Sequence, residues 1–223
     1  MAQRGKFITF EGLDGCGKST QMEKLASVLR AENIAVTMTR EPGGTPAGEK
    51  IRNLLLDTHT CGLTPLAELS LMFAARAQHI QEVIQPAMAS GNIVLCDRFT
   101  DSSEAYQGGG RGLDTAMILE LHHLLCGDLQ PELTILMDSN VDASVDRARR
   151  RNHSKSGQSG ASEPDENRFE QENRAFFERV HDAYLAIAAR EPQRVVVVDA
   201  RGTPQETHKR IIDVVHGRLK NWR

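Results

Sequence analysis

The residues with the clearest chemistry form the run Gly12-Leu13-Asp14-Gly15-Cys16-Gly17-Lys18-Ser19. The run fits the phosphate-binding template of a glycine, four further residues, a second glycine, a lysine and a serine or threonine. Glycines let successive backbone N–H groups converge on phosphate oxygens, and a following helix N-terminus adds positive potential. Lys18 is expected to reach the β- and γ-phosphates of a nucleoside triphosphate, and Ser19 to hold Mg²⁺. The predicted triphosphate-binding residues are Gly12, Leu13, Asp14, Gly15, Cys16, Gly17, Lys18, Ser19 and Thr20.

Hydrophobic periodicity places this loop between a strand and a helix. Phe7-Ile8-Thr9-Phe10 is a continuous run of apolar and β-branched residues, which is typical of a short buried strand. The spacing of Met22, Leu25 and Leu29 predicts that a helix follows the loop. This helix is expected to span Ser19–Arg30. An ordinary glycine turn that matches by chance is the alternative, and the flanking strand and helix argue against it.

Five short apolar runs, each ending in a charged residue, indicate the sheet that positions the loop. They are Phe7–Phe10 before Glu11, Val36–Thr39 before Arg40, Ile93–Cys96 before Asp97, Leu133–Met137 before Asp138 and Val195–Val198 before Asp199. Near-continuous apolar strands that alternate with helices predict an α/β fold with a parallel sheet covered on both faces. Ligands in such sheets gather beyond the carboxyl ends of the strands, so the charged residues are expected at the binding edge.

The remaining helices are predicted from apolar spacing and from glycine and proline signals. They are Pro46–Leu56, Pro65–Ser90, Asp114–Leu125, Val141–Arg151, Asn173–Ala189 and Pro204–Trp222. The segment Asn152–Asn167 is rich in serine, glycine, asparagine and glutamate and lacks apolar periodicity, so it is predicted to be a mobile loop. No repeat or interdomain linker interrupts the chain, and a single domain is expected over residues 1–223.

Composition narrows the classes of protein. With 39% hydrophobic and 26% charged residues among 223, the chain has the composition of a globular protein. A net charge of -3 gives no general reason to expect nucleic acid or an acidic membrane as a partner. No apolar run reaches membrane-spanning length, and the N-terminus does not resemble a signal peptide. The four cysteines form no close pair, which favours reduced thiols and a cytoplasmic location.

A phosphate loop alone permits a GTPase, an ATPase motor, a ligase or a small-molecule kinase. The sequence contains no Asn-Lys-x-Asp run, which disfavours a GTPase, and it has no room for the accessory domain of a motor. Arg40 and Arg98 each follow a predicted strand, and Arg111 follows three glycines. A second group lies just before the polar segment: Arg147, Arg149, Arg150 and Arg151. Because the guanidinium fork makes paired hydrogen bonds to phosphate, two groups of arginines suit two phosphate-bearing substrates.

The second arginine group has two interpretations. On its own it would be read as the solvated face of a helix. Beside a flexible segment, in a chain with a phosphate loop, we favour a lid over approximately residues 147–170 that closes on the transferred phosphate.

Several motifs resemble those of the bacterial thymidylate kinases, a family of P-loop nucleoside monophosphate kinases, and the resemblance runs nearly end to end. The matching segments are Glu11-Gly12-Leu13-Asp14-Gly15, Thr39-Arg40-Glu41-Pro42-Gly43-Gly44-Thr45, Phe73-Ala74-Ala75-Arg76, Asp97-Arg98-Phe99, Ala105-Tyr106-Gln107-Gly108-Gly109-Gly110-Arg111 and Phe176-Phe177. The resemblance implies a three-layer P-loop fold of five parallel strands with a lid. It also implies the reaction of ATP with dTMP to give ADP and dTDP, with Mg²⁺, in a cytosolic homodimer and without nucleic acid or membrane partners.

The resemblance also assigns roles to single residues around the transferred phosphate. Asp14 is similar to the carboxylate that contacts the acceptor 3′-hydroxyl. Arg98 looks like the clamp on the dTMP phosphate, and Asp97 like the residue that orients it or holds Mg²⁺ through water. No arginine stands inside the phosphate loop, so Arg149 and Arg151, assisted by Arg147 or Arg150, are expected to supply the catalytic cation.

The resemblance implies that a second set of residues recognises thymine. In the family the aromatic ring at Phe73 stacks on the base and Arg76 donates to a base carbonyl. The other expected members of the dTMP site are Ser103, Tyr106 and Gln107 near the base and deoxyribose, and Glu41 and Arg52 as supports of the pocket. Without the resemblance, Phe73 would be interpreted as a core residue.

The chain departs from the family pattern at the lid. Asn152–Asp165 is inserted after the arginines, and Asn167-Arg168-Phe169-Glu170 begins with asparagine where the family has aspartate. The adenine pocket carries no clear motif, and the turn after Asp199 is our candidate for it.

Two further functions remain open from the sequence. One is a kinase for another nucleotide such as dUMP, because the thymine methyl group is worth only about 1–3 kcal/mol of discrimination. The other is a regulatory nucleotide-binding protein without turnover. The presence of Lys18, Ser19, Asp14, Asp97 and Arg98 argues against the second, because a protein that only binds nucleotide needs no acceptor clamp.

Overall fold

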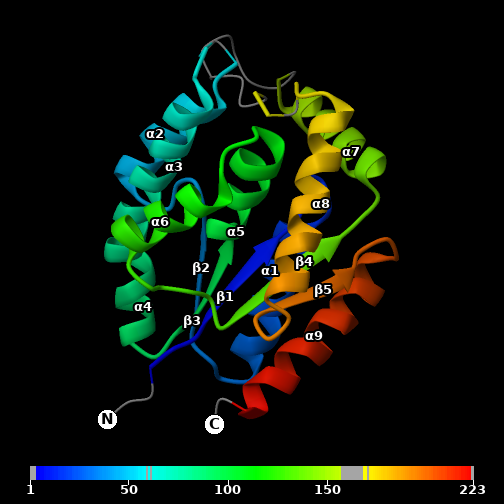
Figure 1. Ribbon diagram of the computed structural model, residues 1–223. Helices are drawn as coiled ribbons and strands as arrows, with labels where there is room; N and C mark the ends of the chain where they lie inside the picture. Colours follow the sequence, from blue (N-terminus) through cyan, green and yellow to red (C-terminus); the bar gives the residue numbers. More distant parts are fainter. Residues whose placement is uncertain (1–3, 59, 61, 157–167, 170, 222–223) are drawn as a thin grey trace.

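In a computed structural model, which describes residues 4–58, 60, 62–156, 168–169 and 171–221, the chain folds around a parallel sheet of five strands (Figure 1). The strands are β1 (Phe7–Glu11), β2 (Val36–Arg40), β3 (Ile93–Asp97), β4 (Leu133–Asp138) and β5 (Val195–Asp199). Their order in the sheet is β2-β3-β1-β4-β5. The predicted strands are confirmed, and the charged residue after each apolar run is the last residue of its strand.

Strand register brings two of these charged residues close to one another at the carboxyl edge. Phe10 of β1 pairs with Asp97 of β3, and Glu11 pairs with Leu136 of β4. The backbone N–H of Arg98 then donates to the carbonyl of Phe10 at 2.9 Å. The phosphate loop and the Asp97-Arg98 pair therefore leave the sheet from neighbouring strands.

Side-chain alternation along β1 divides the core into two layers. The first face of the sheet is covered by α1 (Lys18–Ala31) and α9 (Pro204–Asn221). Ile8 and Phe10 pack on this side with Leu25 of α1 and Ile211 of α9. Phe7 points to the opposite layer, and the alternation of a strand places Glu11 there as well.

The second face is covered by a larger group of helical segments. They are α3 (Pro65–His79), η1 (Ile80–Ile84), α4 (Gln85–Ala89), α5 (Thr100–Ser103), η2 (Glu104–Gly110), α6 (Thr115–Cys126) and α8 (Arg174–Arg190). Outside them, α2 (Pro46–Leu56) packs on α3, and α7 (Val141–Ser156) packs on α8, as Figure 1 shows. No helix among the described residues is long and apolar enough to cross a membrane.

The helix predicted over Pro65–Ser90 is confirmed as a continuous helical segment over Pro65–Ala89, but a π turn divides it. Residues Ile80–Ile84 form η1, and the N–H of Gln85 donates to the carbonyl of Ile80. Pro86 explains the interruption, because a proline inside a helix cannot donate a hydrogen bond and its ring clashes with the preceding turn. Widening the turn before Pro86 accommodates the ring without ending the helix.

The helix that carries the second arginine group is longer than expected. It was predicted to end at Arg151, but α7 continues to Ser156, so the first residues of the segment predicted as a loop are helical. Polar residues alone do not stop a helix, and the first glycine after Arg151 is Gly157. Half of the expected lid, 157–167 and 170, lies outside the described residues.

Three consecutive glycines lie in η2, where sequence reasoning placed no helix. A β-carbon on Gly109 would lie 2.6 Å from the Ala183 β-carbon and 2.9 Å from the Arg179 carbonyl oxygen, both in α8. A β-carbon on Gly110 would meet the ring of Phe176 at 2.5 Å. The glycines therefore let η2 pack against α8 at a distance that no larger residue permits.

We expect Gly109→Ala to lower the free energy of unfolding by about 1–3 kcal/mol, because the added methyl group must displace the backbone of α8. Urea denaturation of the purified protein measures this. Gly108→Ala is the matched control, because its β-carbon would meet its neighbours at ordinary contact distances, of which the shortest is 3.4 Å to the Ile118 side chain. Equal losses in the two variants would show that helix propensity, and not the contact with α8, explains the glycines.

Candidate active site

The phosphate loop between β1 and α1 is shaped by three glycines. Gly12, Gly15 and Gly17 have φ of 128°, 79° and 101°, values that other residues rarely adopt. Among the described residues no side chain caps α1, which begins at Lys18. The N–H groups of its first turn can therefore bind an anion.

Lys18 lies over the loop that precedes it. Its Nζ donates to the carbonyl oxygens of Gly12 at 3.0 Å and Leu13 at 3.1 Å, and it is 3.8 Å from a carboxylate oxygen of Asp14. Cys16 fills a buried slot of the same loop, and burial raises the pKa of its thiol. Cys16 is therefore neutral and packs as a small residue, as the sequence analysis favoured.

Helix α7 touches the loop directly. A β-carbon added at Gly15 would lie 2.2 Å from the Ser144 carbonyl oxygen and 3.0 Å from the Ala148 nitrogen. Arg149 follows Ala148 in this helix, and its Nη2 donates to the carbonyl of Glu172 at 3.0 Å. Arg151 also lies in α7, and its side chain is outside the described part of the structure. Thus α7 brings the second arginine group to the neighbourhood of the phosphate loop.

Arg98 is the most constrained residue of the site. Its φ is 73°, a conformation that is uncommon and strained outside glycine. The Nη2 atom donates to Asp14 Oδ1 at 2.9 Å and to the Tyr106 hydroxyl at 3.0 Å. The Nη1 atom donates to Ser102 Oγ at 2.9 Å and to the Tyr184 hydroxyl at 3.0 Å. The guanidinium is therefore held by four side chains from four segments.

Electrostatics keep this guanidinium charged. Burial opposes the charge, but the carboxylate of Asp14 more than compensates, and the pKa of Arg98 is raised well above its ordinary value. The guanidinium carbon also lies 4.8 Å from the centre of the Tyr106 ring, where a cation–π contact is favourable. A permanently charged, oriented fork of this kind can bind a phosphate.

The candidate metal residues lie together. The Ser19 hydroxyl donates to Asp97 Oδ2 at 3.2 Å. Asp97 Oδ1 is buried and has no hydrogen-bond partner among the described residues. A buried carboxylate oxygen without a partner, beside a serine hydroxyl, fits a hard cation that takes oxygen ligands.

The residues expected to bind thymine form a second cluster, in which Arg76 is the centre. Its Nε donates to Glu41 Oε2 at 2.6 Å, and its Nη2 donates to Ser103 Oγ at 3.0 Å. Its Nη1 is buried and has no partner within the described residues. Its guanidinium carbon lies 4.8 Å from the centre of the fully buried Phe73 ring. One donor therefore remains free beside an aromatic ring.

Glu41 holds this cluster in place. One carboxylate oxygen of Glu41 accepts a hydrogen bond from Arg76, and the other lies 2.9 Å from the ring Nδ1 of His79. Burial alone would raise the pKa of Glu41, but Arg76 and His79 lower it below its ordinary value. Arg52 donates to the carbonyl of the adjacent Pro42 at 3.1 Å. Sequence reasoning missed His79, which shares a helix face with Arg76.

Gln107 and Arg111 belong to a separate network centred on the buried Glu68. The Gln107 amide donates to Glu68 Oε1 at 2.9 Å, and Arg168 donates to Oε2 at 2.7 Å. Arg111 pairs with Glu68 and with Glu172. The arginine after the three glycines is therefore engaged with carboxylates, and Arg40 pairs with Glu49 in the same way.

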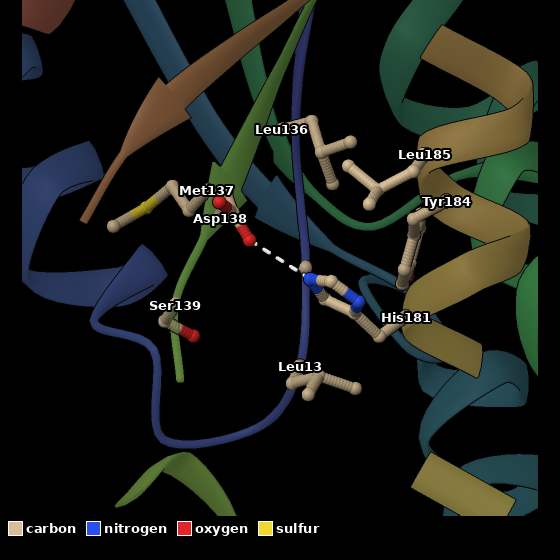
Figure 2. A pocket seen from close by; sticks show the side chains of 9 residues that line it. Leu13, Leu136, Met137, Asp138, Ser139, His181, Tyr184 and Leu185 are labelled. Carbon is tan, nitrogen blue, oxygen red and sulfur yellow. Dashed lines mark hydrogen bonds and ion pairs between the residues drawn. The ribbon is translucent and has the colours of Figure 1, made fainter. Parts of the chain in front are cut away.

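A small pocket lies between the phosphate loop, the end of β4 and α8 (Figure 2). Its lining includes Leu13, Asp138, His181 and Tyr184, and His181 Nε2 lies 2.8 Å from Asp138 Oδ1. Tyr184 therefore lies between this pocket and Arg98. The sequence marks neither Tyr184 nor Ser102. Ser102 lies between the Asp97-Arg98-Phe99 motif and the motif that begins at Ala105, and α8 carries no motif at Tyr184.

Comparison with known proteins identifies the family. The sequence profile of the family described as "Thymidylate kinase" matches residues 10–211. The chain belongs to the thymidylate kinase family.

Individual relatives agree. The thymidylate kinase of Trichlorobacter lovleyi is 50% identical over 213 residues, which cover 96% of this chain and 98% of that protein. That of Pseudomonas syringae pv. tomato is 50% identical over 196 residues, 88% of each chain. The crystal structure of thymidylate kinase from Ehrlichia chaffeensis superimposes with a TM-score of 0.74 at 33% identity and covers 96% of this chain and 99% of that one.

Family membership makes the protein a nucleoside monophosphate kinase, a phosphotransferase. Its reaction is the ATP-dependent phosphorylation of dTMP to dTDP. The resemblance noted in the sequence is thereby confirmed, as is the P-loop fold with five parallel strands.

We expect Glu41→Ala to lower the free energy of unfolding by about 3–5 kcal/mol, because it leaves the buried Arg76 guanidinium without its counterion. Chemical denaturation monitored by circular dichroism measures the change. Glu178→Ala is the control, because its pair with Arg174 is exposed, and it should cost no more than about 1 kcal/mol. Losses of equal size would contradict the structural role of Glu41.

Proposed function

We propose that Arg98 binds the acceptor phosphate of dTMP while the phosphate loop binds ATP, with Asp14 joining the two sites. The observation that carries the proposal is the 2.9 Å hydrogen bond from Arg98 Nη2 to Asp14 Oδ1, because Asp14 belongs to the phosphate loop. A guanidinium held at this point can place the acceptor phosphate beside the γ-phosphate. Phosphoryl transfer depends chiefly on such alignment and on surrounding cations.

On the donor side, the loop glycines, Cys16, Thr20 and the backbone of Leu13 contribute to the ATP site, and Lys18 reaches the β- and γ-phosphates. The uncapped start of α1 supports this assignment. The Lys18 ammonium already lies among loop carbonyls, and a triphosphate would offer it stronger, charged acceptors.

Mg²⁺ is the cofactor we propose, and the described residues fit it. Ser19 and Asp97 would hold the ion, as the partnerless Asp97 Oδ1 suggests. When bound, the ion neutralises charge on the β- and γ-phosphate oxygens.

On the acceptor side, the free Nη1 of Arg76 is a donor for a thymine carbonyl, with Phe73 as the ring beside the base. Ser103, Gln107 and Tyr106 complete the dTMP site, and Glu41 and Arg52 support it. Tyr106 donates to the second oxygen of Asp14 at 3.4 Å, which ties the sugar side of the site to the phosphate loop.

In the transfer step, an oxygen of the dTMP phosphate forms a bond to the γ-phosphorus, and the bond from that phosphorus to the bridging oxygen of ADP breaks. Charge spreads over the transferred group, and Lys18, Arg98 and the lid cations stabilise it. We propose Arg149 and Arg151 as those lid cations, and Arg147 or Arg150 as their assistants, because α7 packs against Gly15.

A single domain over 1–223, with a lid at approximately 147–170, a homodimer and a cytoplasmic location remain part of the proposal. They rest on the family resemblance noted in the sequence.

Arg98→Ala should reduce kcat/KM for dTMP by at least about 100-fold, because it removes a charged, preorganised contact to the acceptor phosphate. A coupled assay of ADP release measures the rate, and a titration with an ATP analogue measures donor binding. Donor binding should change by less than about 3-fold, because the phosphate loop is intact.

Arg30→Ala, at the end of α1, is the matched control and should leave kcat/KM unchanged. If Arg98→Ala weakened ATP binding as much as dTMP turnover, the acceptor-clamp role would be wrong.

Asp97→Asn should raise the Mg²⁺ concentration for half-maximal activity by about 10-fold or more, because an amide oxygen is a weaker ligand than a carboxylate. The readout is activity as a function of free Mg²⁺, together with dTMP binding in a chelator, which should be unaffected. Asp138→Asn is the control, because Asp138 also ends a strand but is paired with His181 and Arg201. An unchanged Mg²⁺ dependence in Asp97→Asn would remove Asp97 from the metal site.

A further inference from the structure

Two hydroxyl groups hold the side of Arg98 that does not face Asp14. Arg98 Nη1 donates to Ser102 Oγ at 2.9 Å and to the Tyr184 hydroxyl at 3.0 Å. The two hydroxyl oxygens are themselves 2.9 Å apart. Ser102 comes from α5 and Tyr184 from α8, so the guanidinium is steadied from two separate elements.

Both hydroxyls also donate a hydrogen bond to one buried carboxylate, that of Glu11. Its Oε2 accepts from Ser102 Oγ at 2.6 Å and from the Tyr184 hydroxyl at 2.9 Å. Its Oε1 accepts the backbone N–H of Phe99 at 2.7 Å. Glu11 is 0% exposed and immediately precedes Gly12, the first glycine of the phosphate loop.

The number of protons fixes the direction of these bonds. Each hydroxyl has a single proton, and a guanidinium has donors but no acceptor. The oxygens of Ser102 and Tyr184 must therefore accept from Arg98. Each hydroxyl lies within hydrogen-bonding distance of Glu11 Oε2, and an ionised carboxylate can accept both protons because it is an acceptor at every lone pair.

We propose that Glu11 is a positioning residue for the acceptor clamp: its carboxylate turns the hydroxyls of Ser102 and Tyr184 so that both oxygens face Arg98 as acceptors. The proposal rests on the proposed role of Arg98 toward the dTMP phosphate. Glu11 touches no substrate in this scheme. Its effect passes through two hydroxyls to the guanidinium, and through Phe99 to the backbone that follows Arg98.

Burying the carboxylate of Glu11 costs free energy, so packing alone does not explain a glutamate at this position. Burial, together with the charge of Asp101 in α5, raises the pKa of Glu11 from its ordinary value to about 7. Arg98, Ser102 and the Phe99 N–H oppose this shift. An apolar side chain would fill the same space without the cost of burying a carboxylate.

Glu11→Gln tests the proposal with almost no change of shape. The Phe99 N–H needs an acceptor, so the amide carbonyl takes the place of Oε1 and the NH₂ group takes the place of Oε2. The amide then donates toward the two hydroxyls, which already accept from Arg98, and their protons lose their common acceptor. The orientation of the clamp is lost, whereas the thymine cluster around Arg76 is untouched.

The experiment compares two ligands by calorimetry with the full chain: dTMP, and thymidine, which lacks the phosphate. In Glu11→Gln we expect the affinity for dTMP to fall about 10- to 100-fold, as for loss of a hydrogen bond to a charged group, and that for thymidine to change less than about 2-fold. Tyr184→Phe should lower the preference for dTMP about 3- to 10-fold. Glu132→Gln is the control, because Glu132 also accepts a β1 backbone N–H, that of Phe7.

Equal losses for dTMP and thymidine in Glu11→Gln, or an unchanged preference for dTMP, would overturn the proposal. If that variant fails to fold, an unchanged preference in Tyr184→Phe overturns it instead. A wild-type protein without preference for dTMP over thymidine would refute the clamp role of Arg98 itself. A preference that Arg98→Ala abolishes and Glu11→Gln preserves would refute only the role of Glu11.

Discussion

The active site depends on one partly buried ion pair, between Arg98 and Asp14. Asp14 belongs to the loop that leaves β1, and Arg98 begins the segment that leaves β3, so the pair joins the two halves of the site. The carboxylate of Asp14 offsets the cost of burying most of the Arg98 guanidinium. Together with Tyr106 and Lys18, this ion pair fixes the position of Arg98, the proposed acceptor clamp, relative to the phosphate loop before any substrate binds. Less entropy is then lost when the substrates reach the reactive geometry.

Buried carboxylates elsewhere in the protein also pair with arginines and restrict their movement. Glu41 neutralises Arg76, Glu68 neutralises Arg111 and Arg168, and Glu11 faces Arg98 through two hydroxyls. Each carboxylate is fixed by several donors, so the cation it supports has little freedom to move. The second face of the sheet therefore contains a network of paired charges as well as an apolar core, and the residues that we propose for the acceptor site lie on this face.

The sequence predicted the parts of this design that depend on local pattern. The five strands, the phosphate loop and the charged strand ends follow from short apolar runs and one spacing motif. Tyr184 could not be predicted, because it meets Arg98 from a helix 86 residues away and no local signal marks it. The helical form of Glu104–Gly110 was also hidden, since three glycines disfavour a helix and only the close packing of α8 explains it. The last residues of α7, up to Ser156, could not be predicted, because a polar composition without apolar periodicity is compatible with either a loop or an exposed helix.

Strand pairing has a consequence for how such an enzyme can diversify. β1 and β3 are hydrogen-bonded neighbours, and the spacing between such strands is roughly 4.8 Å. This spacing sets the separation between the phosphate loop, which follows β1, and Arg98, which follows β3. The residues that we propose to contact the base lie elsewhere, on α3 and on the segment after β3. Mutation can therefore retune which nucleobase is accepted while the distance that the phosphoryl group must travel stays the same.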